Sequence, residues 1–196
     1  LKNSLEDIDI LDGGAGRDTL NATLNAAATT TPALTGIEVV NIRNVTAAAI
    51  VDFTDATGVE QIWNNASTSS LTLTYDAAPI AATFGIRNTK SETTITAFDD
   101  VTGTEDNLAL AVVGAGSDTD NAEVASGDAA AIETMSIAAT GENFVDVSAF
   151  AAITGLTVTG DGSITAVVDV TALETVDASG NTGGVTVDLT GAAADL

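Results

Sequence analysis

The sequence lacks two residue types that carry much of protein chemistry: its 196 residues include no cysteine and no histidine. Their absence excludes thiol nucleophiles, Ser-His-Asp catalysis and most zinc and copper sites. Aromatic residues make up only 4% and there are two prolines, while hydrophobic residues reach 45%. Because Val, Ile and Thr are abundant, this composition favours strands around a narrow core of small side chains. No apolar run approaches the roughly 18 residues that span a bilayer, so we expect no membrane insertion.

Basic residues are also scarce, because only five stand against 28 acidic residues and the formal net charge is −23. Such a charge disfavours nucleic acid and anionic membranes as partners and favours cations. Bound divalent ions would relieve the self-repulsion of the folded chain, and a solvated surface suited to high salt is the alternative explanation. A mean hydropathy of +0.30 argues against a disordered acidic tail.

Two short phrases recur along the chain. The first is a small residue, an apolar residue and Glu, followed by alternating apolar positions, and it occurs at 36–42, 58–62, 131–137 and 172–177. The second is Val-Asp-apolar-Ser/Thr, at 51–54, 145–148, 168–171 and 187–190. The alternation predicts strands. We interpret the Glu as an outward-facing strand residue, with a ladder of carboxylates along one edge as the alternative, and the Asp as a turn or hydrogen-bonding residue because Asp has a poor strand propensity.

The spacing of the phrases predicts the topology. Glu38 and Glu60 are 22 residues apart, and the 41 residues between Glu133 and Glu174 make two such units. Repeats of roughly 20 residues cannot bury a face alone and must stack. We therefore predict an all-β fold, a right-handed parallel β-helix or β-solenoid with calcium-binding turns, and a β-sandwich is the alternative. Residues 1–196 would form one solenoid segment of a larger secreted protein, with irregular coils at 63–130 and loops at 26–32 and 114–128.

The sharpest motif is the stretch from Asp12 to Asn21, which fits the nonapeptide G-G-x-G-x-D-x-apolar-x from Gly13 onward. Its glycines permit a tight turn whose carbonyls face inward, and its Asp supplies a carboxylate. Calcium takes six to eight oxygens, so one nonapeptide supplies half a site and an adjacent coil must supply the rest. An ordinary Gly-Asp hairpin turn is the alternative.

Two further stretches support a calcium interpretation. Residues 113–118 repeat G-x-G-x-D, and residues 99–108 crowd four acids around a glycine turn before an apolar strand. Carboxylates packed in this way repel unless a cation lies among them. The predicted calcium ligands and turn residues are Asp12, Gly14, Gly16, Asp18, Asp99, Asp100, Gly103, Asp106, Gly116, Asp118 and Asp120. No catalytic residue is predicted, and we interpret Trp63 as a packing residue.

The chain resembles the RTX-type calcium-dependent surface-layer proteins of the Caulobacter kind. The resemblance lies in the nonapeptide, in residues 101–108 and in the phrases Gly-Ile-Glu-Val-Val-Asn-Ile and Leu-Glu-Thr-Val-Asp-Ala-Ser-Gly. The resemblance implies type I secretion, calcium-driven folding outside the cell and assembly into a lattice. It departs from the family in carrying one good nonapeptide and one degenerate copy instead of several in tandem.

The expected function is a non-enzymatic structural protein of the bacterial cell surface, secreted and calcium-dependent, that self-assembles into an S-layer, sheath or filament. Its expected partners are other copies of itself, calcium ions and a cell-surface polysaccharide. A stalk or binding module of a large RTX adhesin is the alternative. A polysaccharide lyase is disfavoured, because the basic residues form no cluster in the sequence.

Overall fold

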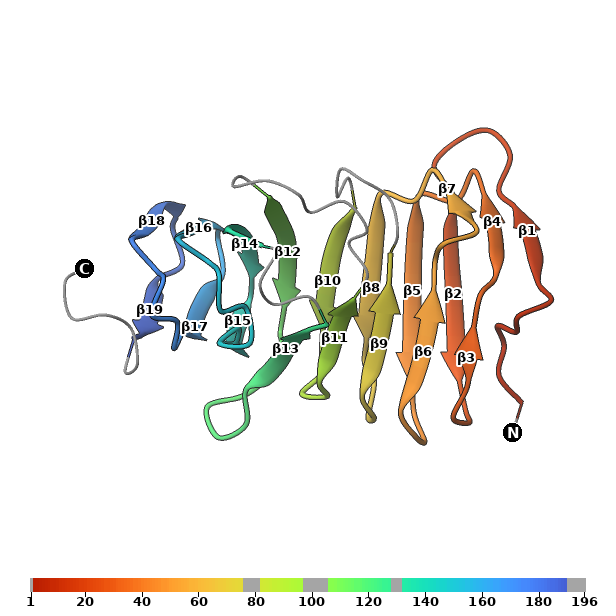
Figure 1. Cartoon of the computed structure of the whole chain (residues 1–196), viewed down its shortest axis with the longest axis horizontal. Helices are drawn as coiled ribbons and strands as arrows, with labels where there is room; N and C mark the ends of the chain where they lie inside the picture. The colour runs from red at the N-terminus through yellow and green to blue at the C-terminus, as the bar shows by residue number, and fades with distance from the viewer. Residues whose placement is uncertain (1, 76–81, 97–105, 128–131, 190–196) are drawn as a thin grey trace.

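The computed structural model describes residues 2–75, 82–96, 106–127 and 132–189, and these contain strands but no helix (Figure 1). The predicted ligands Asp99, Asp100 and Gly103 lie outside the described residues. The first sheet consists of β2 (Thr19–Leu24), β5 (Val39–Asn44), β8 (Gln61–Asn65), β10 (Thr83–Arg87), β12 (Asn107–Val113), β14 (Thr134–Thr140), β16 (Gly155–Gly160) and β18 (Thr175–Asn181). The second sheet consists of β3 (Thr29–Thr30), β6 (Ala49–Asp52), β9 (Leu71–Thr74), β11 (Thr93–Thr96), β13 (Ala122–Ser126), β15 (Glu142–Asp146), β17 (Ser163–Val167) and β19 (Val185–Asp188). A small third sheet holds β1 (Ile10–Asp12), β4 (Ala33–Thr35) and β7 (Ala56–Thr57).

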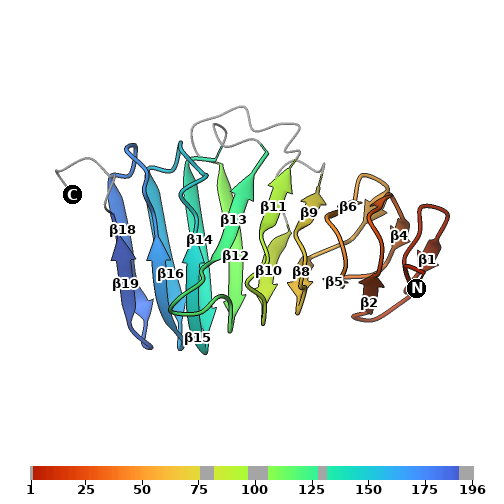
Figure 2. The same ribbon diagram turned by 90° about the horizontal axis from the view of Figure 1, so that it is seen from below.

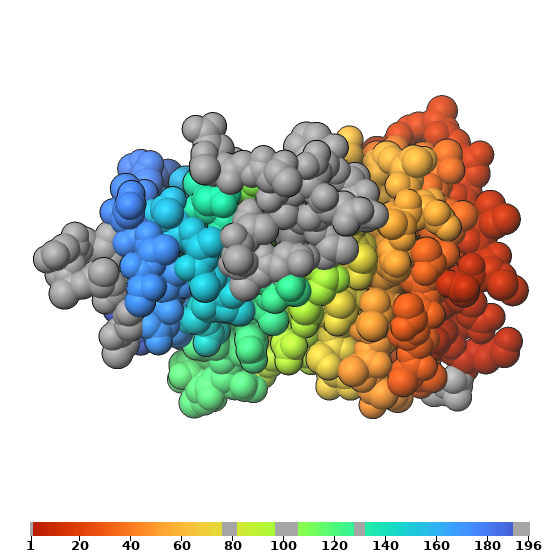
Figure 3. All heavy atoms as spheres, viewed as in Figure 1, coloured from red at the N-terminus to blue at the C-terminus, as the bar shows by residue number. Residues whose placement is uncertain are grey.

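The chain forms a parallel β-solenoid, as the sequence predicted. Each strand of the first two sheets pairs in parallel with its equivalent one coil along, for example β5 with β8 and β6 with β9. The stack runs along the long axis of the molecule in both ribbon views (Figures 1 and 2). In the space-filling view the coils follow one another as colour bands from red to blue (Figure 3). A β-sandwich, the alternative, is wrong, because its hairpins would pair neighbouring strands antiparallel.

The coil length is close to the predicted value of about 20 residues. Thr19 pairs with Val39 and Val39 with Gln61, which gives offsets of 20 and 22 residues. Longer coils occur where the phrases weaken, between residues 63 and 130. There the offset rises to 26 between Phe84 and Leu110, to 27 between Asn107 and Thr134, and to 31 between Thr93 and Val124. The solenoid nevertheless continues through this region, because the extra residues lie between the paired strands.

The core is a set of apolar ladders between the first and second sheets. Alternate residues of each strand point inward, as in β9, where both Leu are buried and both Thr are half-buried. One ladder of fully buried side chains runs through six coils and consists of Val40, Ile62, Phe84, Leu110, Ile137 and Val158. Each of these side chains is at most 2% exposed. Burying such a side chain contributes about 1.5–3 kcal/mol, so the ladder holds neighbouring coils together.

The recurrent phrases mark the corners of the coil and the ends of strands. β5 begins at Val39 and β8 at Gln61, so the Glu of the first phrase precedes the strand instead of lying within it. The expectation that this Glu is a strand residue is therefore wrong. The Asp of the second phrase has the predicted hydrogen-bonding role at two positions. Oδ1 of Asp52 accepts the Thr54 N–H at 3.0 Å, and Oδ1 of Asp146 accepts the Ser148 N–H at 2.9 Å.

Both predicted loops contain a strand, and the loop prediction is wrong there. β3 lies within residues 26–32, and β13 lies within residues 114–128. β13 pairs with β11 and β15, and it buries Ala122 and Val124 completely. Two buried side chains on a parallel ladder are sufficient to hold this short strand, although Gly, Ser and Asp surround it.

Candidate calcium-binding corner

Acidic residues stack at the corner where the chain enters the first sheet. Six of them immediately precede a strand of that sheet: Asp18, Glu38, Glu60, Asp106, Glu133 and Glu174. We call these six residues the acidic corner. Main-chain bonds join its successive coils, since the Glu60 and Gln61 N–H groups both donate to the Glu38 carbonyl at 2.9 Å. The arrangement matches the alternative interpretation, a carboxylate ladder, over the coils of Asp18, Glu38 and Glu60 and again over those of Asp106 and Glu133.

A three-residue turn explains why Glu recurs at this corner. Gly36 and Gly58 adopt positive φ values of 59° and 85°, which favour glycine. The next residues, Ile37 and Val59, are 6% and 5% exposed and anchor the turn in the core. The following Glu is then held at the corner, with its main chain in the ladder and its side chain outside the core.

The nonapeptide forms a longer version of the same turn, between the end of β1 and the start of β2. Gly14 and Gly16 have φ values of 80° and 133°. Oδ1 of Asp12 accepts the Gly14 N–H at 2.9 Å. A Cβ on Gly13 would lie 2.0 Å from the Gly36 carbonyl oxygen of the next coil, so only glycine fits there. The glycines thus bring the turn against the neighbouring coil and place Asp18 at the acidic corner.

The carboxylate of Asp18 is incompletely satisfied. Its Oδ2 atom is buried and has no hydrogen-bond partner among the described residues. The Glu38 side chain reaches back from the next coil, and its Oε2 accepts the Asp18 N–H at 2.7 Å. Asp18 therefore brings together two carboxylates of adjacent coils. One is its own side chain, and the other is that of Glu38, which accepts its main-chain N–H. A buried carboxylate oxygen without a donor is costly unless a cation compensates it.

The same arrangement occurs at Asp106. Its Oδ2 is also buried without a partner in the described part of the chain. Oε2 of Glu133, one coil along, accepts the Asp106 N–H at 3.0 Å. Two places far apart in the sequence thus share one geometry, an Asp before a strand followed one coil later by a Glu.

The donor set at both places suits a hard cation. Calcium prefers carboxylate and carbonyl oxygens, and both are present where Asp and Glu stack on the main chain. Among residues 2–75, 82–96, 106–127 and 132–189, no three acidic side chains converge on one point. At each place two carboxylates would therefore provide the negative charge, from Asp18 and Glu38 at one and from Asp106 and Glu133 at the other. Carbonyls and water would complete the coordination of the cation.

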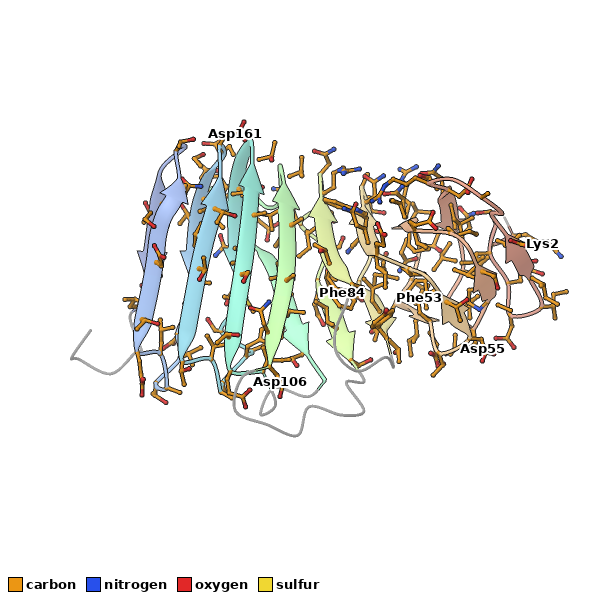
Figure 4. All side chains as sticks on the ribbon, turned by 90° about the horizontal axis from the view of Figure 1, so that it is seen from above. Lys2, Phe53, Asp55, Phe84, Asp106 and Asp161 are labelled. Atoms are coloured by element: carbon orange, nitrogen blue, oxygen red, sulfur yellow. The ribbon has the colours of Figure 1, made fainter. Side chains whose placement is uncertain are left out.

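The remaining predicted ligands lie elsewhere. Gly116, Asp118 and Asp120 belong to the turn between β12 and β13, at the opposite end of the first sheet's strands from Asp106. Figure 4 shows that separation, because Asp106 and Asp161 lie at opposite ends of the strands, and Asp161 follows β16 as this turn follows β12. Asp118 is exposed and borders a small hollow with Glu142. The carboxylate of Asp120 lies 3.8 Å from Nζ of Lys90, so its charge already has a partner.

Sequence reasoning missed Glu38 and Glu133 as companions of Asp18 and Asp106. The signal was present, because each Glu stands directly before a strand whose first residue pairs with the residue after the Asp. Reading the motif across two coils instead of along one would have found both.

Comparison with known proteins yields no match to a family model, a curated protein or a solved structure. In the part of the chain that the structure describes, no helix is long and apolar enough to cross a membrane.

Proposed function

We propose that this chain is a calcium-dependent, non-enzymatic structural segment of a secreted bacterial surface protein, which self-assembles into an S-layer, sheath or filament. The observation that carries the calcium part is the pair of buried, unpartnered Oδ2 atoms at Asp18 and Asp106, each beside a Glu of the next coil. The net charge of −23 adds a global reason, since bound cations reduce self-repulsion.

The solenoid supports the structural part of the proposal. Stacked coils form a rod whose length grows with the number of repeats, which suits a surface coat. The acidic corner runs along this rod, so calcium bound there would tie successive coils together. Export before folding fits such a chain, because calcium is plentiful outside the cell and would drive folding there.

The first test is thermal unfolding by circular dichroism with calcium and with a strong chelator. We expect chelation to lower Tm by about 5–10 °C, which corresponds to the loss of about 2.7 kcal/mol of binding free energy when calcium exceeds its Kd a hundredfold. The double variant Asp18→Asn/Asp106→Asn should lose most of this response. Asp161→Asn, which removes an exposed charge at the opposite end of the strands, is the matched control and should keep it. An unchanged Tm of the natural chain in chelator would contradict the calcium proposal.

The second test is electron microscopy of concentrated protein with calcium. Ordered sheets or filaments that disappear on chelation are expected. Dispersed single particles under these conditions would refute self-assembly and leave the calcium-stabilised rod without its proposed role.

One observation favours the second candidate, a binding module of a large adhesin. A polar hollow of about 520 Å³ opens beside the first sheet, lined by Ser67, Thr68, Asn88, Thr89, Lys90, Ser91, Gly114, Gly116 and Asp120. Hydroxyl and amide groups of this kind hydrogen-bond to sugars. Binding of cell-surface polysaccharide that Thr68→Tyr abolishes, because the larger side chain narrows the hollow, would support this function.

A further inference from the structure

The strands of the two large sheets differ in charge. The strands of the first sheet contain two arginines, Arg43 and Arg87, and a single carboxylate, Asp177 in the last strand. The strands of the second sheet contain no basic residue and five carboxylates: Asp52, Glu123, Glu142, Asp146 and Asp188. In a molecule of net charge −23, the strands of the first sheet are therefore an exception, beyond the acidic corner at which six of them begin.

Basic residues concentrate further at one edge of the first sheet. Lys90 follows β10 closely, so three of the five basic residues lie where β5 and β10 end. The turns after β2, β5 and β8, at 25–28, 45–48 and 66–70, contain no acidic residue, whereas Lys90 has Glu92 close by in the sequence and forms an exposed ion pair with Asp120 at 3.8 Å. We call Arg43, Arg87 and Lys90 the basic strip.

The structure holds the two arginines in place. Nε of Arg43 donates to the Ala66 carbonyl at 3.1 Å, and the Ala66 N–H donates to the Arg87 carbonyl at 2.8 Å. The Arg87 guanidinium lies 4.0 Å from the centre of the Trp63 ring. That ring lies against Gly85, where a Cβ would approach it to 2.1 Å. Trp63 is thus a packing residue that orients a surface arginine, and less conformational entropy is lost when that arginine binds a partner.

We propose that the basic strip is the surface through which a second copy of this chain docks, by the carboxylates Glu123, Asp146 and Asp188 of its second sheet. This inference rests on the proposed self-assembly and names the contact that produces it. Two molecules of such negative charge repel over most orientations, and the basic strip against the second sheet is the pairing that brings opposite charges together.

The spacing of the charges matches in the two surfaces. Asn65 pairs with Arg87, and Ile42 pairs with Asn64, so Arg43 and Arg87 lie two coils apart with Asn65 between them. In the second sheet Asp146 and Asp188 both pair with Val167, so they too lie two coils apart. Neighbouring parallel strands are about 4.8 Å apart, which gives about 10 Å for each pair. Solenoids packed side by side could therefore place both arginines opposite carboxylates at once.

The symmetry of this contact determines the kind of assembly. The basic strip and the second sheet are different surfaces of one molecule, so each copy uses one surface and leaves the other available. Contacts of this kind generate open arrays, or rings where the rotation between copies closes, instead of two-fold dimers. Lateral growth of rods would produce a layer, in agreement with the proposed function.

The test compares charge reversals by analytical ultracentrifugation and electron microscopy in calcium. Arg43→Glu/Lys90→Glu changes two exposed residues of the basic strip. The single variants Arg43→Glu and Lys2→Glu change the net charge equally, and Lys2→Glu, at an exposed residue outside the strip, is the matched control. We expect the double variant to weaken self-association by at least about tenfold, as expected for lost charge pairs, Arg43→Glu to weaken it as well, and the control to associate like the natural chain. Circular dichroism of the variants shows whether they remain folded.

A complementation experiment identifies the partner surface. The variant Glu123→Lys/Asp146→Lys, mixed with Arg43→Glu/Lys90→Glu, should restore association that neither variant shows alone. If the strip variant assembles as the natural chain does, or if the folded mixture stays dispersed, the docking inference is overturned while self-assembly stands. If the natural chain itself does not assemble, the proposed function and the inference both fail.

Discussion

The two ends of the first sheet's strands satisfy their polar groups in different ways. Where the strands begin, carboxylates stack, and Oδ2 of Asp18 and Oδ2 of Asp106 are buried without a partner. Where they end, amides of Asn143 and Asn181 bind the turns. Asn143 accepts the Ala115 N–H at 3.1 Å and donates to the carbonyls of Thr140, Gly141 and Ser163 at 3.1–3.2 Å.

The difference shows which end of the strands satisfies its polar groups without a bound cation. An amide has both donors and acceptors, so one side chain can satisfy several turn groups without help. A carboxylate has only acceptors and needs donors or a cation. Oδ1 of Asn44 and Oδ1 of Asn64 are also buried without a partner, but they carry no net charge and their desolvation costs less. We therefore expect the amide end to be independent of calcium and the acidic corner to depend on it.

The largest expected effect concerns the amide end. Asn143→Ala leaves one N–H and three carbonyls without their partner, and we expect a loss of about 3 kcal/mol or more in the free energy of unfolding. Urea unfolding with and without calcium measures it, and the loss should be the same in both. Asn21→Ala, at an exposed position, is the control and should cost less than about 1 kcal/mol. A loss that calcium restores would contradict the comparison.

A smaller effect is expected from a neutral substitution at the acidic corner. Glu38→Gln keeps an acceptor for the Asp18 N–H but removes a charge, so calcium affinity measured by titration calorimetry should fall about tenfold with the fold unchanged. Glu174→Gln is the matched control, because the preceding coil has Thr154 in place of an Asp at this corner. Equal calcium affinity in both variants would show that Glu38 is not part of the proposed calcium site.

The smallest effect concerns the one basic residue beside the acidic corner. Arg17 forms an ion pair with Glu60, and both side chains are more than half exposed. Exposed pairs contribute at most about 1 kcal/mol, so Arg17→Ala should change Tm by only a few degrees. A large loss of Tm would mean that Arg17, and not a bound cation, stabilises the corner.

The sequence was sufficient to predict the fold because the repeat spacing and the alternation of apolar residues both follow from the stacking of coils. It was less informative about polar contacts. Two of the partners of Asn143 come from Ala115 and Ser163, 28 and 20 residues away, and no local sequence pattern indicates them. Asp18 was visible through its nonapeptide, whereas Glu38 was hidden because a Glu before an apolar alternation resembles an outward strand residue. Strand β13 was missed because the composition around it is typical of a turn, whereas the burial of two of its side chains is enough to form the strand.

The long turn between β12 and β13 shows that a coil can grow without disturbing its neighbours. Thr93 pairs with Val124 across 31 residues, yet the next offset, from Ala122 to Val145, is 23 residues. Additional residues are thus absorbed at the corner and the strand register recovers within one coil. Peptides inserted between Ser117 and Asp120 would be displayed on the side of the rod, at a fixed height along its axis. A fold of this kind can acquire new surface features one coil at a time while its framework stays the same.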